Sequence, residues 1–298
     1  YGTHIFHTSN KEVWTYINKF TEFNNYNHQV VTKHKGKVFQ MPINLETINS
    51  FFKKTLSPAE AKIFLEKISK KYKKNSYSNF EEKAKSQIGN ELYKAFIKNY
   101  TKKQWNKNPN KLPSSIFNRL PIRYSYNEDY YGGTQWQGIP LKGYTYIFKN
   151  LLKNKRIKII YNKTFTFKSN IKPKYLTIYT GPLDKLLDYK FGKLDWRSLK
   201  FKKKTINSND FQGTSVMNYS DLKDKLTRIH EPKHLHPERS AFNSKKTIII
   251  KEFPCKNDEE PYYPINDLKN RAIHRKYKDY LSKFNNLLIG GRLADYAY

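Results

Sequence analysis

The sequence predicts a mixed α/β protein in which helical and sheet-forming segments alternate along the chain. Helix-start signals concentrate between Asn44 and Asn118, whereas short apolar runs that suit buried strands concentrate beyond Pro140. With 298 residues, the chain is long enough for one large or two medium domains with substantial cores. No clean linker and no internal repeat separates these parts, so we expect an interleaved layout.

Within the first 43 residues, the spacing of apolar side chains changes from one typical of a helix to one typical of a strand. Ser9 followed by Glu12 is a capping-box pattern, and the predicted helix presents one apolar face, formed by Val13, Trp14, Ile17 and Phe20. The runs 30–32 and 37–41 are joined across Lys35-Gly36, which predicts a short hairpin.

The segment that follows carries three helix starts and predicts a helical subdomain. Asn44 precedes an apolar stripe, Ser57 is followed by Pro at the first helical position, and Ser78-Asn79-Phe80-Glu81 begins a third helical pattern. The Lys-, Asn- and Ser-rich stretch 69–79 is expected to be a surface loop.

Beyond Pro140 the pattern is typical of strands. The apolar runs 156–160, 175–179 and 287–289 predict buried parallel strands, whose carboxyl ends would face a ligand crevice. The segments 196–211 and 247–253 partly alternate apolar with polar residues, as half-exposed antiparallel strands do.

The charge balance is strongly basic, with 57 Lys and Arg against 25 Asp and Glu, a net charge of +32. Together with 16% aromatic residues, this leaves a nucleic-acid-binding protein as one alternative. Only nine of the cations are Arg, and the Lys residues are spread along the whole chain. Because base readout and phosphate clamps favour Arg, we expect no specific nucleic-acid site.

Cysteine and histidine usage gives no sign of a disulfide framework or a metal centre. Cys255 is the sole cysteine, and no apolar run reaches 18 residues, so we expect a reducing, cytoplasmic setting without a membrane span. His230, His234 and His236 form a metal-like cluster, but prolines interrupt any helix there. We therefore expect no metal and interpret this segment as a polar mobile loop.

Several separate motifs resemble the flavin-dependent UDP-galactopyranose mutases. They are Tyr-Gly-Thr-His-Ile-Phe-His at 1–7, the aromatic stretch 96–105, Asn-Arg-Leu-Pro at 118–121, Glu-Asp-Tyr-Tyr at 128–131 and Gly-Arg-Leu at 291–293. Spacing alone would favour a core stripe for 96–105, because its aromatic residues fall on one side of a helix. The motifs span nearly the full chain in the order of the family.

The resemblance implies an isomerase that interconverts UDP-galactopyranose and UDP-galactofuranose without net redox change. In the family the reaction passes through a covalent adduct between reduced FAD and the sugar, and it supplies galactofuranose for cell-surface polysaccharides. The cofactor is then the nucleophile, which agrees with the absence of a recognisable side-chain nucleophile motif. The sequence leaves the assembly open, with a homodimer as one option.

The resemblance also assigns roles to individual residues. Arg119 and Arg228 match the two catalytic arginines that hold the diphosphate, a role that suits two guanidinium groups. The residues that match substrate-binding positions are His28, Phe96, Tyr100, Thr101, Trp105, Tyr130, Asn218, Tyr263 and Tyr298. Those that match the flavin environment are His4, Ile5, His7 and Arg292. In the family, the position of His28 is Asn or His.

The expected fold is a truncated Rossmann-like FAD-binding domain interleaved with a helical-bundle subdomain and an antiparallel sheet subdomain. The predicted division gives FAD-domain segments at 1–28 and 257–298, a hairpin at 29–43, the helical subdomain at 44–122, a mixed segment at 123–190 and the antiparallel sheet at 191–256. No Gly-x-Gly-x-x-Gly occurs, which the resemblance explains by a missing N-terminal FAD-binding unit. A catalytically inactive remnant is therefore a second alternative.

Overall fold

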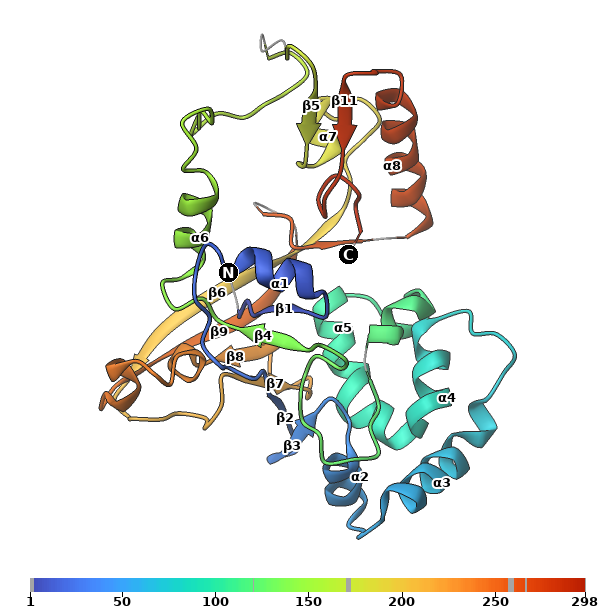
Figure 1. Cartoon of the computed structure of the whole chain (residues 1–298). Coiled ribbons are helices and arrows are strands. Elements are labelled where there is room, and N and C mark those ends of the chain that lie inside the picture. Colours follow the sequence, from blue (N-terminus) through green and yellow to red (C-terminus); the bar gives the residue numbers. More distant parts are fainter. Residues whose placement is uncertain (1–2, 120, 170–172, 257–259, 266, 298) are drawn as a thin grey trace. The chain divides into compact units, whose positions relative to one another are not determined.

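The computed structural model describes residues 3–119, 121–169, 173–256, 260–265 and 267–297 (Figure 1). The chain forms two compact units. Unit 1 comprises Tyr1–Ile157 and Lys200–Pro254, and unit 2 comprises Lys158–Leu199 and Cys255–Tyr298. The expected mixed α/β architecture is confirmed. The finer six-segment division and the Rossmann-like character of its FAD-domain segments stay predictions.

Unit 1 is built on a mixed sheet with the strand order β6-β9-β8-β7-β2-β3. The predicted hairpin is confirmed as β2 (Val30–His34) and β3 (Lys37–Met41), with Lys35 and Gly36 both at positive φ in its turn. Strand β7 (Val216–Tyr219) runs parallel to β2, and β8 (Arg228–His230) is antiparallel to β7 and β9. The predicted strands at 196–211 and 247–253 are β6 (Trp196–Ile206) and β9 (Thr247–Lys256).

One row of directly opposed residues crosses this sheet and defines the face on which the candidate site lies. Its members, from β3 to β9, are Phe39, Thr32, Asn218, Arg228 and Glu252. Opposed residues of neighbouring strands project from the same face of a sheet, so these side chains share one surface.

The helical part of unit 1 covers the same face. It contains α2 (Leu45–Phe52), α3 (Pro58–Ser69), η1 (Lys70–Tyr72), α4 (Phe80–Leu92), the π-helical turn η2 (Tyr93–Lys98), α5 (Asn99–Trp105), η3 (Pro109–Lys111) and η4 (Ser114–Arg119). Helix residues Ile88, Leu92 and Phe96 share a buried cluster with Phe39 and Val216 of the sheet. This packing places α5 over the row that contains Arg228.

Local signals predicted these helices well. Asn44 and Ser57 are the N-caps of α2 and α3, as expected, and Asn79, within the predicted start 78–81, is the N-cap of α4. The loop expected at 69–79 is wrong in part, because residues 70–72 continue α3 as a 3₁₀ turn. Such turns are common at helix ends because they satisfy otherwise unpaired carbonyl groups.

The first helix begins differently from the prediction. Helix α1 (Lys11–Ile17) is capped by Asn10, whose side chain accepts from the N–H groups of Glu12 and Val13, whereas Ser9 donates to the carbonyl of Gly133. The predicted apolar face is also only partly buried, because Val13 is 44% exposed. Trp14 does pack, against Phe23 and Phe6, the first residue of β1 (Phe6–Thr8).

The remaining elements of unit 1 are short. Strand β1 pairs antiparallel with β4 (Trp136–Gly138), and α6 (Tyr144–Leu151), η5 (Pro232–Leu235) and η6 (Ser240–Asn243) complete the unit. The strand predicted at 156–160 is wrong: this segment is irregular, and Ile160 is 55% exposed. The N–H groups of Arg156 and Ile157 bond locally to Asn154, and no described strand pairs with this segment, so it does not form a strand.

Unit 2 contains a two-stranded parallel sheet, as the runs 175–179 and 287–289 predicted, but the expected burial of these strands is wrong, because Ile178 is 69% and Leu288 54% exposed. Strands β5 (Thr177–Tyr179) and β11 (Leu287–Ile289) pair in parallel, and α7 (Leu183–Leu186) and α8 (Leu268–Leu281) share a buried cluster next to them. Strand β10 (Tyr263–Pro264) pairs with the first two residues of β6. Among the described helices, none is long and apolar enough to cross a membrane.

The buried cap Asn44 should matter more for stability than the exposed cap Ser57. The Asn44 side chain accepts from Thr47 and donates to the Gln40 side-chain oxygen at 2.7 Å. Asn44→Ala removes a cap, worth about 0.5–2 kcal/mol, and leaves buried groups unpaired at about 1–3 kcal/mol more. Ser57→Ala, the control, loses only the cap. Equal shifts of the urea midpoint in the two variants, followed by circular dichroism, would contradict this ranking.

Candidate functional site

Arg228 lies at the centre of the candidate site. It begins β8, and its Nε donates to the hydroxyl of Tyr100 at 2.7 Å and lies 3.9 Å from a carboxylate oxygen of Glu252. The guanidinium carbon also lies 5.9 Å from the centre of the Tyr100 ring. These contacts join the sheet to α5 and fix the plane of a group that can bind a phosphate through two hydrogen bonds.

Glu252 is the buried charge that supports Arg228. It is 3% exposed, and it interacts with Nε2 of His230 at 3.0 Å and accepts from the hydroxyl of Thr227 at 3.0 Å. Burial acts to raise the pKa of Glu252, but the charge of Arg228 and the hydrogen bonds outweigh it and lower the pKa. The carboxylate is therefore ionised at neutral pH.

His230 extends these contacts to the start of the chain. Its Nδ1 lies 2.6 Å from the hydroxyl of Thr3, and its ring is 3% exposed. A continuous series of contacts thus runs from Thr3 through His230, Glu252 and Arg228 to Tyr100. The interpretation of His230 as part of a mobile polar loop is wrong, because the residue ends a central strand and faces the same side as Arg228.

His28 and Tyr130 lie together at a second corner of the site. The Tyr130 N–H donates to the His28 carbonyl at 2.8 Å, and their rings meet edge to face at 5.2 Å. The His28 ring also interacts with the hydroxyl of Tyr26 at 3.0 Å. Burial, reinforced by the positive charge of Arg228, lowers the pKa of His28 to about 3, so the ring is neutral at physiological pH.

Asn218 presents a polar atom with no partner. It stands between Thr32 and Arg228 in the row across the sheet, and its side-chain oxygen is buried without a hydrogen-bond donor among the described residues. A buried acceptor that is left unpaired costs about 1–3 kcal/mol, so such atoms commonly mark places where a ligand or water completes the bonding. A sugar hydroxyl is a suitable donor.

Part of the aromatic stretch around α5 is buried in the core, where its side chains have little surface left for a ligand. Phe96 is 3% exposed and packs on Phe39 and Phe51 at ring distances of 5.0 and 5.3 Å, and Thr101 is 5% exposed. Trp105 is partly exposed at the end of α5, where Asn106 turns the chain at positive φ. The core interpretation therefore holds for Phe96, and its contact with a ligand stays a prediction.

Three of the four residues expected at the flavin lie on and before β1. Ile5 is buried, His4 is exposed and its carbonyl accepts from the Tyr144 hydroxyl, and His7 stacks on Tyr131 at 3.7 Å. Burial lowers the pKa of His7. Sequence reasoning missed Tyr131, although it is the immediate neighbour of Tyr130 in a quoted motif.

Other expected site residues belong to unit 2 or lie outside the described part. The Arg292 guanidinium lies 5.9 Å from the centre of the Tyr263 ring, so the structure brings these two together within unit 2. Gly291, at φ 87, allows the turn that precedes Arg292. Tyr298 and the side chain of Arg119 lie outside the described residues.

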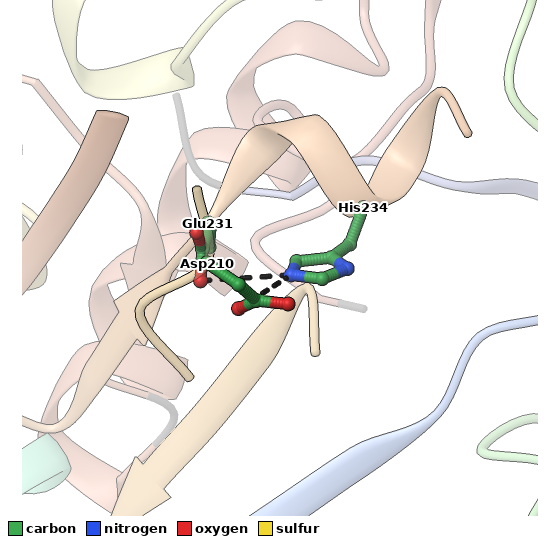
Figure 2. Close-up of side chains that lie close together, drawn as sticks. All are labelled: Asp210, Glu231 and His234. Carbon is green, nitrogen blue, oxygen red and sulfur yellow. Dashed lines mark hydrogen bonds and ion pairs between the residues drawn. The ribbon is translucent and has the colours of Figure 1, made fainter. Parts of the chain in front are cut away.

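A compact acidic cluster lies apart from these residues (Figure 2). Nε2 of His234 is 3.2 Å from Asp210 and 3.6 Å from Glu231, and ligand atoms of the three lie within 4.8 Å of one another. The Glu231 carboxylate already accepts from the N–H groups of Phe211 and Gln212 and from Thr247. These hydrogen bonds give the cluster a structural role, because they hold the loop before β7. The absence of a metal stays a prediction.

Comparison with known proteins gives one consistent family. A family model described as UDP-galactopyranose mutase matches residues 95–298. A Klebsiella pneumoniae protein named "Probable UDP-galactopyranose mutase" is 39% identical over 302 residues, which cover 100% of this chain and 76% of that protein. An Escherichia coli protein named "dTDP-fucopyranose mutase" is 36% identical over 306 residues, covering 100% of this chain and 80% of its own length.

A solved structure agrees in fold. A crystal structure of reduced UDP-galactopyranose mutase superimposes with a TM-score of 0.76 at 14% identity, over 100% of this chain and 80% of that one. At this identity the likeness concerns the fold alone.

The buried neutral ring of His28 should make stability fall in mild acid. Its pKa of about 3 in the folded chain lies below the usual 6.5, so between these values the unfolded chain binds more protons. From about pH 7 to about pH 5 the free energy of unfolding should fall by about 1–2 kcal/mol on this account.

His28→Asn removes the titrating group and provides the comparison. Urea unfolding of both proteins at several pH values should give a shallower dependence in the variant. Parallel pH dependences in the two proteins would show that His28 is not held neutral.

Proposed function

This chain belongs to the UDP-galactopyranose mutase family, and we propose that it catalyses the reversible isomerisation of UDP-galactopyranose to UDP-galactofuranose. The observation that carries the proposal is the fixed Arg228 guanidinium, held by Tyr100 and Glu252 beside the unpaired oxygen of Asn218. An oriented guanidinium suits a diphosphate, and a sugar hydroxyl is a suitable donor to the Asn218 oxygen.

We propose that Arg228, together with Arg119, binds the diphosphate of the substrate. The UDP group must be held while its bond to the sugar breaks and must still be in place when the bond re-forms. A guanidinium that is oriented beforehand loses little freedom on binding, so it can hold the leaving group through the whole reaction. Glu252, opposite Arg228 on the neighbouring strand, helps to orient the guanidinium because its carboxylate is buried and ionised.

The neutral His28 and the tyrosines beside it suit the sugar. At neutral pH an uncharged imidazole can accept or donate one hydrogen bond without placing a second positive charge near Arg228. Tyr130 adds a ring that excludes water, and Asn218 offers its unpaired oxygen. We propose that these three residues orient the sugar while its ring changes size, and that Trp105 stacks on the uracil.

The cofactor of the proposed reaction is reduced FAD, which when bound supplies the nucleophile for the anomeric carbon. The residues on and before β1 fit its ring system: Ile5 gives a buried apolar contact, and His7 is already ordered by its stack on Tyr131. Arg292 lies beside Tyr263 within unit 2, and its role toward the flavin stays a prediction of the sequence. The sequence has no Gly-rich pyrophosphate turn, so we expect these 298 residues alone to bind FAD weakly.

A second substrate has specific support. The relative named dTDP-fucopyranose mutase is nearly as similar, at 36% identity against 39%. dTDP-fucopyranose differs from UDP-galactopyranose in its base, in having deoxyribose in place of ribose, and in lacking the hydroxyl on carbon 6 of the sugar. Assembly as a homodimer, a cytoplasmic location and a role in galactofuranose glycans stay predictions of the sequence.

The proposed activity can be tested on the natural protein that contains these residues. With FAD and dithionite it should convert UDP-galactofuranose to UDP-galactopyranose, as followed by chromatography of the nucleotides, and it should be inactive with oxidised FAD. dTDP-fucopyranose is assayed in parallel, so that preferential turnover of that compound would replace the proposed substrate. Failure to take up FAD or to convert either compound would refute the function.

The two arginines should be needed for turnover. Loss of one charge-assisted contact to the diphosphate is worth about 1.5–3 kcal/mol, so Arg119→Ala or Arg228→Ala should lower kcat/KM by roughly ten- to a hundred-fold or more. Lys should restore activity only partly, because a point charge does not reproduce the planar fork. Arg156→Ala, in an exposed segment, is the matched control. Wild-type rates in both site variants would show that the residue assignment is wrong.

A further inference from the structure

The Lys103 side chain ends in a cage of backbone carbonyl oxygens. Its Nζ lies 2.6 Å from the oxygen of Tyr219, 3.0 Å from those of Asp221 and Asp224, and 2.9 Å from that of Leu226. We call these four oxygens the carbonyl cage. An ammonium has three N–H donors, so four acceptors at these distances use its full capacity.

This arrangement is unlike an ordinary surface lysine. Burial lowers the pKa of Lys103 to about 8, although the charges of Asp224 and Asp221 act in the opposite direction. A partly buried ammonium is stable only when dipoles or charges replace its water, and here the carbonyl cage supplies them. The neighbouring Lys102, by contrast, is exposed on the same helix.

The carbonyl cage belongs to the loop that connects two strands of the candidate site. Residues 220–227 link β7 to β8, so Tyr219 follows Asn218 directly and Leu226 lies two residues before Arg228. Lys103 itself lies three residues after Tyr100, on the adjacent turn of α5. Lys103 therefore connects the helix that carries Tyr100 to the hairpin that carries Asn218 and Arg228.

We propose that Lys103 is a positioning residue of the nucleotide-sugar site: it clamps the β7–β8 loop onto α5 and so keeps Arg228 beside Tyr100. The inference rests on the proposed function, because it assigns the diphosphate to Arg228. The hydrogen bond and the ring contact between Arg228 and Tyr100 both join side chains alone. The clamp adds four contacts between the backbone of the hairpin and the same helix, which fixes the guanidinium before a ligand arrives.

The first experiment compares Lys103→Met with Lys102→Met. Methionine keeps most of the length and the apolar stem of Lys103 but removes the ammonium. In calorimetric titrations with UDP, Lys103→Met should bind about ten- to a hundred-fold more weakly than wild type, as expected when a binding group is misplaced. Lys102→Met should bind as wild type does. Equal affinity of all three proteins for UDP would overturn the proposal.

A chemical rescue separates the charge from simple packing. Lys103→Cys is made in a background without other cysteines, which includes Cys255→Ser, and is alkylated in urea and refolded. Reaction with 2-bromoethylamine rebuilds an ammonium of nearly the same length, whereas 2-iodoethanol gives a neutral side chain of the same size. The aminoethylated protein should recover UDP affinity, and the hydroxyethylated protein should not. Equal recovery in both would show that the side chain only fills space.

Hydrogen exchange of the ligand-free proteins tests the clamp independently of the proposed function. Peptides that cover residues 219–228 should exchange faster in Lys103→Met than in wild type or Lys102→Met. Unchanged exchange would refute the clamp even where UDP binding falls. Conversely, a wild-type protein that does not bind UDP would refute the proposed nucleotide site, and with it the positioning role, while faster exchange in Lys103→Met would still establish the clamp.

Discussion

The buried carboxylate of Glu252 is the constraint on which the candidate site depends. A carboxylate that is 3% exposed must be paired, and its partners here are Arg228 and His230 of the neighbouring strand and Thr227, the residue before that strand. A shift of β8 by one residue would turn Arg228 and His230 away from it and bury an unpaired charge. The electrostatics of one side chain therefore specify the register that places the guanidinium next to α5.

The part of the fold that sequence predicted well is the part that local chemistry determines. Asn44, Ser57 and Asn79 cap their helices because a side-chain oxygen meets a backbone N–H two or three residues away, and the turn at Lys35-Gly36 needs positive φ at both positions. Predictions failed where the outcome depended on distant partners. Among the strands that the structure describes, none pairs with the apolar run 156–160. Asn10 caps α1 in place of Ser9, whose hydroxyl bonds to the carbonyl of Gly133.

The candidate site was accessible to sequence reasoning only through motif resemblance. Arg228 and Tyr100 are separated by more than a hundred residues, and no spacing rule relates them. Glu252 could have been noticed, because it occupies an otherwise apolar alternation with Ile248 and Ile250 on β9, where an acidic residue implies a buried partner. Lys103 offered no such signal, because its partners are backbone oxygens, which every residue possesses.

We expect the net charge of +32 to affect how fast anions meet the protein and not which anion it selects. Many lysines lie over aromatic rings, such as Lys190 at 4.0 Å from the centre of the Tyr280 ring and Lys83 at 4.8 Å from that of Tyr77. Such contacts leave the charge near solvent and spread over the surface. A diffuse positive field attracts any anion, including a nucleotide-sugar diphosphate, and salt screens it over about 8 Å at physiological ionic strength. On the proposed function, discrimination between anions comes from fixed groups such as Arg228, because a guanidinium held by Glu252 and Tyr100 suits only a narrow range of phosphate geometries.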